Sequence, residues 1–137
     1  MYKTIVIAFL VLITACNNRP NSGSSQEDSS HQHESENSQY TLFSEGYEFF
    51  IEHPQLEAGV EAEFLVHLTD LVTYDPCSEG KVTILMDGIS VTSGDPFAPG
   101  IFHVPFIPKK GGAFHAEISF KEGNLEEEVE AHVHVAA

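Results

Sequence analysis

The chain has 137 residues, with 21 Asp and Glu against 6 Lys and Arg, and its formal net charge is −15 when histidine is neutral. This acidity argues against binding to nucleic acid or to anionic lipid headgroups through the surface field, although it attracts cations. The length predicts one folded domain, and two cysteines are too few for a disulfide framework.

The N-terminal stretch has the pattern of a signal peptide. Lys3 supplies a positive charge, and an apolar run follows from Ile5 to Ile13. This run is too short to span a membrane comfortably. The sequence I-T-A-C that ends at Cys16 looks like a bacterial lipobox. We therefore expect a signal peptide over residues 1–15, lipid on Cys16, and a lipoprotein held at the membrane in the periplasm or cell envelope, at the outer membrane. An ordinary signal peptide or a short membrane helix is the alternative.

A polar tether is predicted between the lipid and the domain. Residues 16–39 are rich in Ser, Asn, Gln and acidic residues, and after Cys16 this stretch has no aliphatic or aromatic side chain. Such a composition buries too little apolar surface to offset the loss of chain entropy. His31 and His33 in this segment could take up a cation loosely, but a disordered H-x-H more often has no role.

The folded domain is predicted over residues 40–137, and its apolar residues alternate with polar ones. The alternation indicates strands at Tyr47–His53, Ala62–Leu68, Lys81–Asp87, Ile101–Ile107, Ala113–Phe120 and Glu128–Val135. Turn residues separate these segments at short intervals, and no segment has a convincing helical period. We predict an all-β, immunoglobulin-like antiparallel β-sandwich of about 7 strands. Pro105 marks its strand as an edge strand or a bulge.

Three segments carry a family resemblance. They are E-F-F-I-E-H-P-Q-L-E-A-G-V-E-A-E-F-L-V-H-L-T-D-L (48–71), E-G-K-V-T-I-L (79–85) and P-G-I-F-H-V-P (99–105). Together they resemble the N-terminal β-domain of CusB-like periplasmic adaptors of heavy-metal RND efflux systems, and the pattern is also similar to small extracytoplasmic domains of the YtkA kind. The resemblance covers about residues 47 to 134, nearly the whole folded part. It implies an extracytoplasmic β-domain that works with heavy-metal efflux components.

The chain departs from the family after this domain. Such adaptors continue with a coiled-coil hairpin, a lipoyl-like lobe and a β-barrel, which contact the pump and the outer-membrane channel. This chain has none of these parts after its β-domain. We therefore expect either a free-standing relative or a remnant of a truncated adaptor, and not a working adaptor by itself.

Histidines on the predicted strands are the strongest metal-ligand candidates. His132 and His134 are two residues apart, so a strand directs both imidazoles to one side, beside Glu130. If the last two predicted strands form a hairpin, His115 could lie near His134 across the ladder. His103 and His67 could add to the same face or lie elsewhere. Imidazoles with a third ligand suit Cu, Zn or Ni, but alternating His and Glu is also typical of a solvated strand face.

Cys77 is the remaining metal candidate. It follows Pro76 in a loop of about eleven residues, which predicts a thiol near the surface with Asp75 and Glu79 nearby. One cysteine with carboxylates is not a zinc or copper ligand set, so an incidental thiol in a structured loop is the simpler interpretation.

Enzymatic activity is not expected. The sequence has no G-x-S-x-G, H-E-x-x-H or glycine-rich phosphate loop, and the acidic run Glu126–Glu128 is typical of a solvated turn. We predict an accessory metal-binding or efflux-associated module, anchored to the membrane by lipid and without nucleic-acid partners. The alternative is a protein-interaction or surface-attachment lipoprotein that binds no metal.

Overall fold

The computed structural model describes residues 37–137, which form nine β-strands and no helix. The strands are β1 Ser38–Phe43, β2 Tyr47–His53, β3 Leu56–Glu57, β4 Ala62–Asp70, β5 Lys81–Met86, β6 Ile89–Thr92, β7 Ile101–Phe106, β8 Gly112–Glu122 and β9 Leu125–Ala136. Within this part of the chain, a helix of the length and hydrophobicity needed to cross a membrane is not found. The predicted signal peptide, Cys16 and most of the predicted tether lie outside the described residues.

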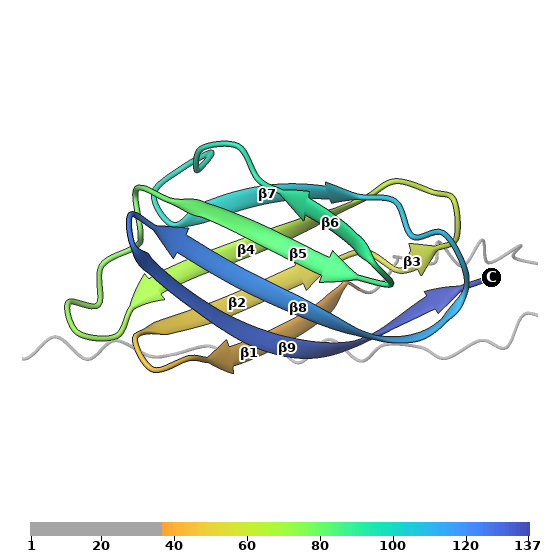
Figure 1. The fold of residues 1–137 in the computed structure, drawn as a ribbon, viewed down its shortest axis with the longest axis horizontal. Helices are drawn as coiled ribbons and strands as arrows, with labels where there is room; N and C mark the ends of the chain where they lie inside the picture. The colour runs from red at the N-terminus through yellow and green to blue at the C-terminus, as the bar shows by residue number, and fades with distance from the viewer. Residues whose placement is uncertain (1–36) are drawn as a thin grey trace, which may run out of the picture. The chain divides into compact units, whose positions relative to one another are not determined.

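The strands form two sheets in a β-sandwich-like arrangement (Figure 1). One sheet has four strands in the order β1-β2-β4-β7, and the other has five in the order β3-β9-β8-β5-β6. The all-β prediction is confirmed. Neighbouring strands are antiparallel as predicted, except that the short strand β3 pairs with β9 in parallel.

One apolar core lies between the two sheets. Its largest fully buried side chains include Phe49, Phe64, Phe102, Phe106 and Phe120. The ring centroids of Phe102 on β7 and Phe120 on β8 are 5.9 Å apart, so side chains of the two sheets meet directly. Burial of each such side chain stabilises the fold by roughly 1.5 to 3 kcal/mol. The inward faces that the period-two pattern predicts are the faces that the structure buries.

Three strands were not predicted from the sequence. β1 starts at Ser38, two residues before the predicted domain boundary. It was missed because the polar residues of its first half conceal the alternation. β3 has two residues, which is too short to show a period. β6 is the four-residue return strand of a hairpin, and its turn residues Asp87 and Gly88 have φ values of 50° and 72°. Positive φ at both positions is typical of a type I′ turn.

Pro105 lies on an edge strand, as predicted. β7 ends the four-stranded sheet, with β4 on one side and no strand on the other among the described residues. Proline has no backbone N–H to donate to a neighbouring strand, so an edge position tolerates it.

Candidate metal centre

The hairpin β8–β9, which is the longest in the structure and blue in Figure 1, positions the candidate site. Its turn begins at Gly123, whose φ of 58° is the left-handed conformation that tight hairpin turns require. The pair Glu122↔Leu125 closes this two-residue turn, and the register places His115 directly opposite His132. Counting alternate pairs from the turn makes this a non-hydrogen-bonded pair, in which facing side chains approach most closely.

Three exposed side chains meet on the outer face of this hairpin. The ring centroids of His115 and His132 are 4.3 Å apart, and the ring planes meet at 64° in an edge-on arrangement. His115 Nδ1 lies 2.8 Å from Glu130 Oε1. One ligand atom from each of His115, Glu130 and His132 can be chosen so that all three lie within 4.8 Å of one another. Small adjustments of exposed side chains would therefore direct two imidazoles and a carboxylate to one ion.

Glu130 brings a negative charge to this cluster. The hydrogen bond from His115 lowers the pKa of the Glu130 carboxyl group, the charge on His115 adds to the effect, and His132 contributes a smaller part. Glu130 is therefore ionised at neutral pH. The net charge of the chain is also negative and attracts cations to the surface.

His134 is not directly opposite His115 but lies two positions further along the ladder. The sequence suggested that His115 and His134 would be neighbours across the ladder, but His134 is opposite Ala113. The turn residues fix the register, and a shift of two residues keeps every side chain on the same face of the sheet, so alternation alone cannot detect it. His134 nevertheless borders a hollow of about 220 Å³, together with His115, His132 and Ala113.

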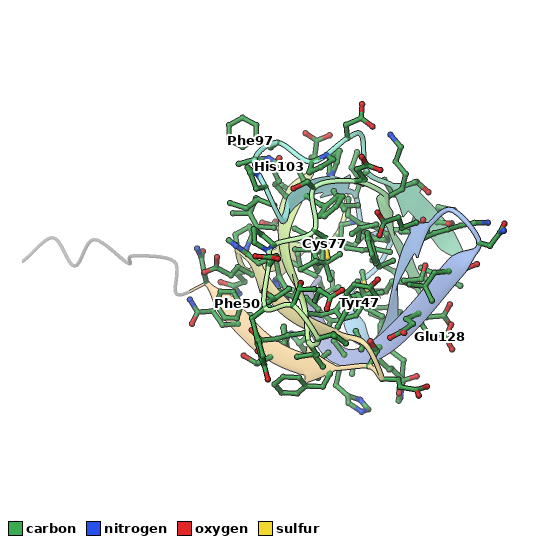
Figure 2. The ribbon with its side chains drawn as sticks, turned by 90° about the vertical axis from the view of Figure 1, so that its left-hand side faces the viewer. Tyr47, Phe50, Cys77, Phe97, His103 and Glu128 are labelled. Atoms are coloured by element: carbon green, nitrogen blue, oxygen red, sulfur yellow. The ribbon has the colours of Figure 1, made fainter. Side chains whose placement is uncertain are left out.

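His67 and His103 lie elsewhere, on the outer face of the four-stranded sheet. His67 Nε2 is 3.2 Å from Glu52, and His103 Nδ1 contacts Glu63. Each ring also lies beside a phenylalanine, which for His103 is Phe97 with a centroid distance of 4.8 Å (Figure 2). The structure does not bring these two histidines together with the β8–β9 cluster, so they are not ligands of the same ion.

The expectation of a surface thiol at Cys77 is wrong. Cys77 is 9% exposed and belongs to the hydrophobic core, between the sheets in Figure 2. Backbone hydrogen bonds fix its loop: Cys77 N–H donates to the Leu68 carbonyl oxygen, and the Cys77 carbonyl oxygen accepts from Gly100 N–H. Burial raises the pKa of the Cys77 thiol to about 11, and the charges of Glu122 and Asp70 act in the same direction. A thiol that resists ionisation is a poor metal ligand.

Two polar residues with structural roles were not predicted. His53 is buried in the core, although its inward parity after Tyr47, Phe49 and Ile51 was visible in the sequence. Glu127, in a run interpreted as solvated, accepts hydrogen bonds from the Ser44 hydroxyl and from Gly46 N–H. Its role could not be read from the sequence, because its partners lie more than 80 residues away.

Comparison of the chain with models of protein families, with curated proteins and with solved structures finds no match.

Proposed function

We propose that this protein is a lipid-anchored, extracytoplasmic module that binds a divalent transition metal ion on the outer face of β8–β9. One observation carries this proposal: the ligand atoms of His115, Glu130 and His132 lie within 4.8 Å of one another. Cross-strand pairing brings these three donors together, so the fold itself assembles the set before any ion arrives.

The donor chemistry selects the class of ion. Imidazole nitrogens suit copper, zinc and nickel, whereas calcium and magnesium prefer sites built from oxygen donors alone. Two imidazoles and one carboxylate therefore favour Cu(II), Zn(II) or Ni(II). The acidic surface supports this function by raising the local concentration of cations.

An immunoglobulin-like topology fits the strand order. With β2, β4, β5, β6, β7, β8 and β9 lettered A, B, C, C′, E, F and G, one sheet contains A-B-E and the other contains G-F-C-C′. β1 is then an extra strand beside A, and β3 is a short strand beside G. This order supports the immunoglobulin-like assignment, as does the resemblance to the first domain of efflux adaptors.

Sequence patterns support the proposed cellular setting. The lipobox-like segment ending at Cys16 supports an anchor in the cell envelope. Together with the resemblance to heavy-metal efflux adaptors, it supports an accessory role in which the module takes up metal near an efflux system.

Calorimetric titration of the full chain with Cu(II), Zn(II) and Ni(II), starting from metal-free protein, tests this function. A His31→Gln/His33→Gln background removes the H-x-H of the N-terminal segment. We expect one saturable site with a dissociation constant on the order of micromolar or lower. The additional pair His115→Gln/His132→Gln removes two ligands and should abolish this binding.

The matched control is His67→Gln/His103→Gln, which removes two histidines from the other sheet. It should bind metal as the background does. Equal losses in both double variants, or heats without a defined stoichiometry in the background, would contradict the proposed site.

A protein-interaction function without metal is the second candidate. Phe97 is 78% exposed beside His103, and Phe43 is 61% exposed on the edge strand β1. Exposed aromatic side chains are common at protein interfaces, and an edge strand can accept a further strand. A module of this kind would keep its partner after replacement of His115 and His132 and lose it after replacement of Phe97.

A further inference from the structure

The contact between His115 and Glu130 bears on whether Glu130 binds the ion directly or supports His115 through a hydrogen bond. Glu130 Oε1 already lies at hydrogen-bond distance, 2.8 Å, from His115 Nδ1. A ligating histidine commonly donates its other ring N–H to a carboxylate, which fixes the tautomer and the ring orientation. In this arrangement His115 Nε2 is the metal donor, and Glu130 supports the ring without bonding to the ion.

A third imidazole stands beside the other two. His134 is two residues after His132 on β9, so both side chains leave the same face of the strand, and both are exposed. Its partner across the ladder is Ala113, whose methyl group leaves the space next to His134 unfilled. The hollow of about 220 Å³ lies at this position and is bordered by all three histidines.

We infer that the ion is held by three imidazoles, His115 Nε2, His132 and His134, with Glu130 as the residue that positions His115. This inference rests on the proposed function and changes its ligand set from two histidines and a carboxylate to three histidines. Rotation of the exposed His134 side chain toward the hollow brings the third nitrogen to the ion without any change in the backbone.

The ligand set has a functional consequence. Structural zinc sites are closed by four protein ligands, whereas sites with three protein ligands keep an open position. Here all three imidazoles are exposed and come from one hairpin, so an incoming donor can reach the ion while the protein still holds it. One new metal–donor bond can form before each metal–imidazole bond breaks, and no oxidation or reduction is involved. We therefore assign the site to reversible metal exchange, in which the ion is cargo.

Electron paramagnetic resonance with Cu(II) as the probe tests the ligand set. One equivalent of Cu(II) is added to the full chain in the His31→Gln/His33→Gln background, and pulsed methods count the coordinated imidazoles. We expect three. His134→Gln should leave two and weaken binding. Glu130→Gln should keep three and weaken binding by about 10- to 100-fold, as is typical when a support of a ligating histidine is removed.

Glu128→Gln is the control for charge, since Glu128 is exposed on the same face of β9. It should change neither the nitrogen count nor the affinity by more than a small factor. If Glu128→Gln weakens copper binding as much as Glu130→Gln does, the positioning role of Glu130 is overturned. Both residues would then act only by general electrostatic attraction of the ion.

Addition of ¹⁵N-labelled imidazole tests the open position. A ternary complex that contains the labelled nitrogen and all three protein imidazoles would support an exchange site. An unchanged spectrum would overturn that assignment.

The possible failures are distinguishable. Copper bound through His115 and His132, with His134→Gln unchanged in nitrogen count and affinity, would overturn the three-histidine inference and leave the proposed function standing. The absence of one-to-one copper binding in the background protein would overturn both.

Discussion

His53 is a titratable ring in an apolar environment. It is 3% exposed and lies between the Tyr40 and Phe64 rings, with centroid distances of 5.6 and 4.7 Å. Its Nδ1–H donates to the Pro54 carbonyl oxygen, while Nε2 is buried without a hydrogen-bond partner within residues 37–137. Burial lowers the pKa of His53, and the hydrogen bond to Pro54 offsets part of this effect. The core therefore holds a neutral imidazole.

Stability should decrease in mild acid because of this residue. Below the ordinary histidine pKa of about 6.5, the unfolded chain binds a proton at position 53 that the folded chain does not. The free energy of unfolding then falls as pH is lowered from about 6.5 to the folded-state pKa, by at most about 1.4 kcal/mol per pH unit. Urea unfolding with a chelator present, at several pH values from 7.5 to 5, measures this slope.

His53→Phe should flatten the slope, because it keeps a ring between Tyr40 and Phe64 without a titrating group. His134→Gln removes an exposed histidine and should keep the wild-type slope. If His53→Phe and the wild type lose the same free energy over this pH range, the buried histidine is not the cause.

At the scale of the element, two glycines with positive φ have different surroundings. Gly80, just before β5, has φ +92°, and a Cβ atom there would lie 2.5 Å from Phe120 Cε2 and 2.8 Å from the Lys121 carbonyl oxygen. Gly88, in the β5–β6 turn, has φ +72°, and no atom of the described residues lies within 4 Å of such a Cβ. Glycine is therefore required at position 80 both by the positive φ and by the close packing. At position 88 only the positive φ requires it.

Alanine at these positions should separate the two effects. Gly88→Ala should lower the free energy of unfolding by about 1 to 2 kcal/mol, from the left-handed backbone alone. Gly80→Ala should lower it by about 3 kcal/mol or more, because Phe120 or the β8 backbone must also move. Urea denaturation at pH 7.5 gives both values. Equal losses would show that the core accommodates the added methyl group freely.

The sequence predicted the strands better than it predicted which residues face each other across neighbouring strands. Alternation located six strands and their buried faces, because burial on one face imposes a period of two whichever strand lies alongside. It did not reveal that His115 faces His132, which depends on the two-residue turn at Gly123. It also placed Cys77 at the surface, because a loop with proline and acidic residues is usually exposed, whereas packing between the sheets buries this thiol. The sequence thus predicted which histidines form the candidate site, but not which of them face each other across the two strands.

At the scale of the whole molecule, Glu127 links the two sheets. It lies on β9 of the five-stranded sheet, and it accepts a hydrogen bond of 2.9 Å from Gly46 N–H in the turn between β1 and β2. The Ser44 hydroxyl of the same turn donates to the same carboxylate oxygen. Glu128, the next residue, points outward on β9 and is exposed (Figure 2). One acidic residue of the run is therefore structural and its neighbour is solvated.

Glu127→Ala should lower the free energy of unfolding by about 1 to 3 kcal/mol, because it leaves the Gly46 N–H and the Ser44 hydroxyl without their charged acceptor. Glu128→Ala should leave stability unchanged or raise it slightly, since it reduces the negative charge at the surface. Thermal and urea unfolding of the two variants measure the difference. If both substitutions have the same effect, the acidic run acts only through its charge.

The position of β1 determines how the domain responds to mechanical load. Among the strands of residues 37–137, β1 pairs with β2 alone, whereas β9 lies between β8 and β3. A pulling force transmitted through the chain ahead of Ser38 acts first on the Ser38↔His53 pair, at the end of β1 away from its turn. The hydrogen bonds of β1 would then break in succession and not all at once. Under tension this edge strand can extend as a compliant segment, while the β8–β9 hairpin and its histidines keep their geometry.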